Sequence, residues 1–209
     1  MGGKHFCVSF AEPRDLDACL SIGQSVMLDN GAFSTFTRGV EFDIDAFYGW
    51  VESVIGHPHW AVVPDVIGGS VDEQRRRVSG WRFPRELGAP VYHLGLPHEW
   101  LFELADNWPR ICIGSSGEFW QVGSAKWCAE MDRTFNALAG RYRHLPWIHG
   151  LRMLDQAGSE YPLASADSTN VGRNFKSAAR RPDEMADQID VRQCPTRWKQ
   201  RAEQERLFA

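Results

Sequence analysis

The sequence predicts an α/β fold of parallel strands in one domain, residues 1–209. Three observations support this. Short apolar runs rich in β-branched and aromatic residues recur along the chain, and most are followed by a stretch with apolar residues at helical spacing. Strand followed by helix, repeated, is typical of parallel βαβ units. No repeat, low-complexity tract or Pro/Ser-rich linker divides the chain.

Seven apolar runs are predicted strands because each is short and is followed by turn-forming or helical sequence. An eighth run, residues 19–22, is weaker, since only two residues separate it from the next run. Eight strands would close a (β/α)8 barrel, for which 209 residues is close to the lower size limit, whereas seven could equally form an open doubly wound sheet. The seven clear runs are residues 5–10, 25–28, 60–63, 91–94, 111–113, 147–151 and 163–166.

Four stretches are predicted helices. Residues 43–55 begin with an aspartate and carry apolar side chains at helical spacing. Residues 70–78 open with a Ser-x-x-Glu capping pattern, and residues 97–107 have a proline at the expected first position. Residues 121–142 are the longest candidate.

Composition excludes several classes of protein. The chain is 43% hydrophobic with a net charge of −4, which is globular and argues against a bulk electrostatic binder of nucleic acid. No apolar stretch matches a membrane helix or a secretory signal, so we expect a cytoplasmic protein without membrane partners. The odd number of cysteines, none in a C-x-x-C pair, predicts reduced thiols and no zinc site; they are Cys7, Cys19, Cys112, Cys128 and Cys194.

The C-terminal segment, residues 173–206, differs in charge from the rest of the chain. It holds nine basic and six acidic residues, a local balance of +3 that leaves −7 for the remainder. A mixture of this kind is typical of a solvated helix, and it also suits a surface that contacts phosphates. The sequence alone leaves both interpretations open.

Three aspartates follow predicted strands. Asp29, Asp65 and Asp167 come at or just after the ends of three runs, each beside small residues that let a ligand approach the backbone. In parallel α/β folds, chemistry collects at the carboxyl ends of strands. Each aspartate alone is equally consistent with a turn or a helix cap, so the signal lies in their combination.

In order along the chain, these strand ends resemble the tRNA-guanine transglycosylase superfamily. The first motif is similar to that family's Asp-Ser-Gly-Gly-aromatic turn, and the last to its nucleophile strand with a following Gly-Arg-Asn. The resemblance covers residues 25–174. Its motifs are Asp29-Asn30-Gly31-Ala32-Phe33, Asp65, His93-Leu94-Gly95, Gly114-Ser115-Ser116-Gly117-Glu118, and Ala166-Asp167-Ser168 with Gly172-Arg173-Asn174.

The short chain and the absent zinc motif are most similar to the phage-type 7-deazaguanine DNA transglycosylases. The resemblance implies a compact (β/α)8 TIM-like barrel without a zinc-binding appendage, and it favours residues 19–22 as a short second strand. It also implies exchange of guanine in a polynucleotide for a 7-deazaguanine. His93 stands where the family has glutamine, which leaves the identity of the incoming base open.

The chemistry assigns roles to the aspartates. Exchange at a sugar C1′ without net inversion needs two displacements, so a carboxylate must attack and hold a covalent glycosyl intermediate. We expect Asp167 to be this nucleophile. A second group must protonate the leaving guanine and deprotonate the incoming base, a role predicted for Asp29. Asp65 is predicted to accept the two adjacent donors of guanine.

The remaining candidates bind the base or the polynucleotide. Backbone amides near Gly95, or in the turn that begins at Gly114 and Ser115, are predicted to meet the guanine carbonyl, helped by His93. Phe33 and Met153 are candidates for the two apolar faces that a flat base requires. The nearest basic cluster for phosphates is Arg173, Lys176, Arg180 and Arg181.

We therefore expect a pentosyltransferase, free of metal and cofactor, that replaces guanine in DNA with a base such as 7-cyano-7-deazaguanine. The free 7-deazaguanine is its co-substrate, and a phage-encoded protein would act in the host cytoplasm. Three alternatives remain from the sequence: the same exchange on tRNA, a nucleic-acid-binding barrel without catalysis, and an N-glycoside hydrolase that uses water.

Overall fold

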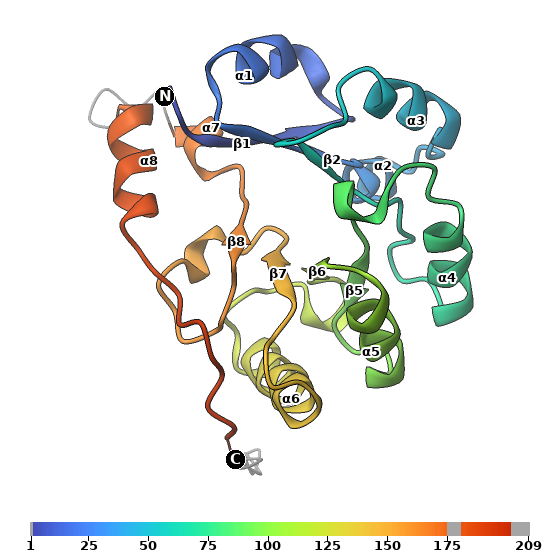
Figure 1. The fold of residues 1–209 in the computed structure, drawn as a ribbon, viewed down its shortest axis with the longest axis vertical. Helices are drawn as coiled ribbons and strands as arrows, with labels where there is room; N and C mark the ends of the chain where they lie inside the picture. The colour runs from blue at the N-terminus through green and yellow to red at the C-terminus, as the bar shows by residue number, and fades with distance from the viewer. Residues whose placement is uncertain (1, 175–180, 202–209) are drawn as a thin grey trace.

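The computed structural model describes residues 2–174 and 181–201. In this part of the chain, strands form two four-stranded parallel sheets, with helices around their outside (Figure 1). The seven predicted runs all contain strands. The first sheet has the order β1 (His5–Ser9), β2 (Ser25–Asp29), β3 (Trp60–Val62) and β4 (Gly88–Ala89), and the second β5 (Val91–His93), β6 (Arg110–Gly114), β7 (Trp147–Gly150) and β8 (Ser165–Ala166).

The two sheets meet at Pro90, the single residue between β4 and β5. The carbonyl of Ala89 accepts a hydrogen bond from the amide of Val63 (3.0 Å), on the β3 side. The carbonyl of Pro90 accepts from the amide of Cys112 in β6 (2.8 Å). Because proline has no amide hydrogen, the ladder is interrupted there. The segment from β4 to β5 thus links the two sheets. Within each sheet, neighbouring strands are consecutive in the sequence.

The prediction of a strand at residues 19–22 is wrong. These residues form the end of helix α1 (Leu16–Ile22), which closes with a hydrogen bond from the amide of Gly23 to the carbonyl of Cys19. Leu16, Cys19 and Leu20 all pack into one core cluster, at the spacing of a helix face. A run of four apolar residues does not distinguish the two structures by periodicity.

The four predicted helices are confirmed, three with shorter bounds and the one at residues 70–78 shifted by one residue. They are α3 (Ile44–Glu52), α4 (Val71–Ser79), α5 (His98–Asn107) and α6 (Ala125–Arg141). Asp43 caps α3, and Ser70 and Glu73 form a reciprocal capping box at the start of α4. Helix α2 (Ala32–Arg38) was not predicted, because the Asp-Asn-Gly sequence before it suggested only a turn.

The C-terminal segment is helical only in part. Helix α7 (Asn170–Asn174) precedes residues 175–180, which lie outside the described part, and helix α8 (Pro182–Asp190) follows them. Residues 191–201 form no helix. Helix α8 returns to the first strand, where Lys4 pairs with Asp187 (2.6 Å) and Asp190 (2.5 Å). Of the basic segment predicted to be helical, residues 173–206, the described part therefore contains the end of α7 and helix α8, which begins at Pro182.

The strands have two chemically different faces. One face packs against the helices, with side chains such as Leu28, Ile111 and Ile148 fully buried. The other face carries a cluster that joins the two sheets through Met27, Trp60, Val62, Ala89, Val91 and Cys112. Across this inner face, the rings of Trp60 and Trp147 meet at 5.5 Å. The inner faces of the two sheets therefore share one interior.

None of the described helices is long and apolar enough to cross a membrane.

Candidate active site

The Asp65 carboxylate follows β3 and is held from two sides. The side-chain amide of Asn30 donates to Oδ1 of Asp65 (2.7 Å) and to the carbonyl of Val63 (3.0 Å). Oδ2 of Asp65 lies 2.8 Å from Nε2 of His93, and both side chains are only 7% exposed. This network ties together the ends of β2, β3 and β5. Asn30 was not predicted as a site residue, although its position directly after a strand-end aspartate was the available signal.

His93 also reaches the end of β6. Its Nδ1 lies 3.3 Å from the hydroxyl of Ser116. A neutral His93 that donates from Nε2 to Asp65 accepts at Nδ1 from this hydroxyl, so the network is satisfied by one tautomer. The imidazole is thus fixed by two partners from different strands.

Asp167 follows β8 and has two partners, both on Oδ1. The amide of Arg152 donates to Oδ1 at 2.9 Å, and Nε2 of His149 lies 3.2 Å from it. The other imidazole nitrogen of His149 lies 2.6 Å from the hydroxyl of Ser165, and its ring stacks on Trp147 with an interplanar angle of 14°. Among the side chains that the structure describes, which do not include those of Asn170 and Arg173, no contact to Oδ2 of Asp167 is found. Oδ1 is therefore the anchored oxygen.

Sequence reasoning missed His149. It occupies an inner-face position of β7 and is 3% exposed. The period-2 alternation of the predicted strand places residues 147, 149 and 151 on the same face, which was the signal available. Its pairing with Asp167 depends on the register of β7 and β8, where His149 is opposite Ser165.

Asp29 ends β2 opposite Ser9 of β1. Burial, together with the negative charges of Asp167 and Asp65, raises the pKa of Asp29 to about 6, against the opposing effect of hydrogen bonds from Ser9 and the amide of Gly31. The three predicted aspartates are therefore close enough to affect one another. A carboxyl group with this pKa is able to donate and accept a proton near neutral pH.

The aromatic candidates differ in accessibility. Phe33 lies on α2, is 38% exposed, and carries the guanidinium of Arg152 over its ring at 3.7 Å. Met153 is fully buried in the large core cluster and is packed against Gly150. It has no exposed face to offer a ligand.

The two turns predicted to donate hydrogen bonds to the guanine carbonyl, at Gly95 and at Gly114–Ser115, already make contacts within the protein. The amide of Gly95 donates to Oε1 of the buried Glu130 (3.3 Å). A Cβ on Gly114 would lie 3.3 Å from Nδ1 of His93, so this glycine lets the imidazole lie against the backbone. Ser115 is buried, and its hydroxyl accepts from the indole of Trp127 (2.8 Å).

Substitution of Gly95 by alanine is expected to destabilise the protein by about 2 to 4 kcal/mol. The residue has φ +91°, and a Cβ there would lie 2.7 Å from the ring of the buried Phe119. Gly117 is the matched control, because it has φ +55° but no atom within 4 Å of its Cβ position, so Gly117→Ala should cost only about 1 kcal/mol. Urea unfolding measures both. Equal losses of unfolding free energy in the two variants would show that the ring of Phe119 does not exclude a Cβ at residue 95.

The predicted phosphate-binding residues are only partly described. Arg173 lies on α7, and Lys176 and Arg180 lie outside the described residues. Arg181 is exposed and pairs with Asp183 (2.7 Å) at the start of α8. Its charge is therefore shared with a neighbouring carboxylate.

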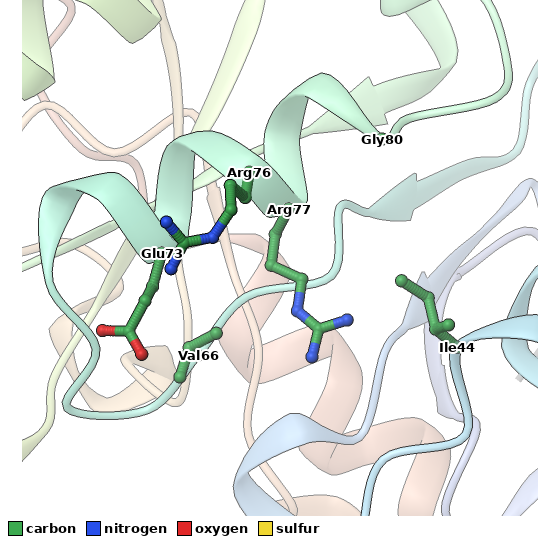
Figure 2. A pocket seen from close by; sticks show the side chains of 6 residues that line it. All are labelled: Ile44, Val66, Glu73, Arg76, Arg77 and Gly80. Atoms are coloured by element: carbon green, nitrogen blue, oxygen red, sulfur yellow. The ribbon is translucent and has the colours of Figure 1, made fainter.

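A cavity of about 420 Å³ lies between α3 and α4, on the helix side of the fold (Figure 2). Val66, directly after Asp65, lines it, and buried Gln74 holds the backbone of Val66 through both its amide and its carbonyl. Arg76, Arg77 and Glu73 supply both signs of charge to its wall. The cavity contains none of the predicted site residues.

Among residues 2–174 and 181–201, no group of three or more histidine, cysteine or acidic side chains is arranged to hold a metal ion. All five cysteines are free. Comparisons of the chain with protein-family models, curated proteins and solved structures gave no match.

Proposed function

We propose that this chain is a nucleobase transglycosylase that exchanges guanine in DNA for a 7-deazaguanine through a covalent bond to Asp167. The observation that carries the proposal is the grouping of Asp29, Asp65 and Asp167 with three different environments. Asp167 has one anchored oxygen, Asp65 is clamped on both oxygens, and the pKa of Asp29 is raised to about 6. A surface that only binds phosphates has no use for three adjacent carboxylates.

In the first displacement, Oδ2 of Asp167 attacks C1′ of the deoxyribose. The C1′–N9 bond breaks, its electron pair goes to guanine, and protonated Asp29 gives its proton to the departing base. The hydrogen bonds to Oδ1 from Arg152 and from His149 hold the carboxylate in place during the attack. The product is a glycosyl ester of Asp167 and free guanine.

In the second displacement, the incoming 7-deazaguanine gives its N9 proton to Asp29 and attacks C1′. The ester bond to Asp167 breaks, and its electron pair returns to the carboxylate. Two inversions give net retention at C1′. Asp29 ends protonated, ready for the next leaving base, so the cycle needs no cofactor.

Asp65 is suited to recognising the base. Guanine offers two adjacent donors, its ring N–H and its exocyclic amine, and each carboxylate oxygen retains a second lone pair after contacting Asn30 or His93. Phe33, which is partly exposed, supplies a ring for stacking, and in this structure the guanidinium of Arg152 lies over that ring. A base inside a duplex must be flipped out first, and the sequence after Asp167 supplies the basic residues predicted to contact the backbone phosphates.

We also infer that the strands close as a (β/α)8-type barrel. Two observations support closure. Trp60 and Trp147, which belong to different sheets, are in ring contact across the inner face. Helix α8 is tied by Lys4 to the first strand. The guanidinium of Arg110 lies over both tryptophan rings, 4.5 and 4.4 Å from their centroids, and so adds a cation–π contact to each sheet.

Release of labelled guanine tests the function. The protein is incubated with DNA or tRNA carrying labelled guanine, with and without 7-cyano-7-deazaguanine. We expect repeated release from DNA only when the free base is present; without it, release should stop at one guanine per protein molecule, because Asp167 then carries the sugar. Repeated release without added base would instead indicate a hydrolase, release only from tRNA the corresponding RNA enzyme, and binding without release a nucleic-acid-binding module.

A further inference from the structure

Arg152 has an unusual position next to the nucleophile. It is the non-glycine residue with positive φ (59°) in the described part of the chain. This conformation turns its amide toward Oδ1 of Asp167, to which it donates at 2.9 Å. A left-handed arginine costs about 1 to 2 kcal/mol, so the contact is maintained against local strain.

The side chain of Arg152 extends across the site to Phe33. Its guanidinium carbon lies 3.7 Å from the centroid of the Phe33 ring, and the guanidinium donates to the carbonyl of Ser115. A flat group at this distance above a ring is in the place that a stacked base requires. In the ligand-free protein, the accessible face of Phe33 is therefore occupied by another planar group.

The guanidinium is held by weak partners. Within residues 2–174 and 181–201 it forms no ion pair with a carboxylate; it contacts one backbone carbonyl and one aromatic face, and the charges of Asp167 and Asp29 attract it from farther away. Other arginines in the described part are paired, such as Arg75 with Glu103 and Arg141 with Asp106. Displacing the Arg152 side chain thus breaks one hydrogen bond and one cation–π contact.

We propose that Arg152 is a specificity-determining residue that exchanges partners during binding: it covers Phe33 in the free protein, is displaced by the entering base, and then binds a phosphate of the same nucleotide. This inference rests on the proposed function. The backbone amide stays on Asp167, so the side chain moves about a fixed point beside the nucleophile. The phosphates are joined to the same sugar that Asp167 attacks, within the span of an extended arginine.

The proposal predicts opposite effects on the two substrates when the side chain is removed. Arg152→Gly suits the positive φ and keeps the amide that contacts Asp167. Measured by calorimetry, the variant should bind free 7-cyano-7-deazaguanine roughly fivefold to tenfold more tightly, because no guanidinium must be displaced. It should bind a guanine-containing single-stranded oligodeoxynucleotide roughly fivefold to tenfold more weakly. The slope of log K against log salt concentration should fall by about 0.7, the loss of one phosphate contact.

Arg141→Ala is the matched control, because Arg141 is an exposed arginine at the far end of α6 and should change neither affinity. Weaker binding of the free base by Arg152→Gly, or an unchanged salt slope, would overturn the inference. If the wild-type protein binds the free base and Arg152→Gly binds it with the same affinity, this inference is overturned but the proposed function is not. A wild-type protein that neither binds the base nor exchanges guanine would overturn the proposed function and this inference with it.

Discussion

Replacement of Asp167 by asparagine is expected to reduce guanine exchange by roughly 10⁴-fold or more, because the amide cannot form the glycosyl ester. Asparagine keeps an oxygen that accepts from the amide of Arg152, so the fold should be retained. The rate of labelled-guanine release from DNA measures the effect. Circular dichroism and urea unfolding establish that the variant is folded.

Asp155→Asn is the matched control for this substitution. Asp155 is exposed, lies in the connection between β7 and β8, and belongs to a 3₁₀ turn without a role in the proposed chemistry. Its replacement should leave exchange within about twofold of wild type. Residual exchange of more than a few per cent in Asp167→Asn would mean that another group attacks C1′.

Replacement of Asp29 by asparagine is expected to separate activity from stability. Loss of the acid/base group should lower the exchange rate by roughly 10²- to 10⁴-fold. At pH 8 the same variant should be more stable than wild type by about 2 to 3 kcal/mol, since a buried carboxylate with a pKa of about 6 destabilises the fold when it is ionised.

The pH dependence of this stability gain has a defined sign. The folded protein holds the Asp29 proton up to about pH 6, whereas the unfolded chain releases it near pH 3.8. Wild-type stability therefore falls as pH rises between these values, and above pH 6 the full cost is present. The advantage of Asp29→Asn should shrink as pH falls through 6 and disappear near pH 4. An advantage that is constant with pH, or a variant that is less stable at pH 8, would contradict the assignment.

The sequence predicted the strands well because their apolar runs are separated by clear turns. It did not predict that Pro90 divides one segment between two sheets, since the proline stands next to an ordinary strand pattern. It was wrong at residues 19–22, where four apolar residues fit a helix face as well as a strand. An apolar pattern distinguishes a helix from a strand only when the run is long enough to show either the helical or the strand period.

The site was predicted through its aspartates and less well through their partners. Asp29, Asp65 and Asp167 stood out because each follows a strand. Their partners were missed because they matter only through tertiary contacts, which the spacing of residues along the sequence does not reveal. These partners are His149, Asn30 and the amide of Arg152. Met153 was proposed as a stacking residue, and its complete burial follows from packing against Gly150, which the local sequence does not reveal.

The most direct test of the account is to trap the covalent intermediate. The protein is mixed with a guanine-containing single-stranded oligodeoxynucleotide without added 7-deazaguanine, quenched with acid, digested and analysed by mass spectrometry. The account predicts a glycosyl adduct on the peptide that contains Asp167. The adduct should be present in wild type and Asp155→Asn and absent from Asp167→Asn. An adduct on a different residue, or base exchange that proceeds without any adduct, would contradict it.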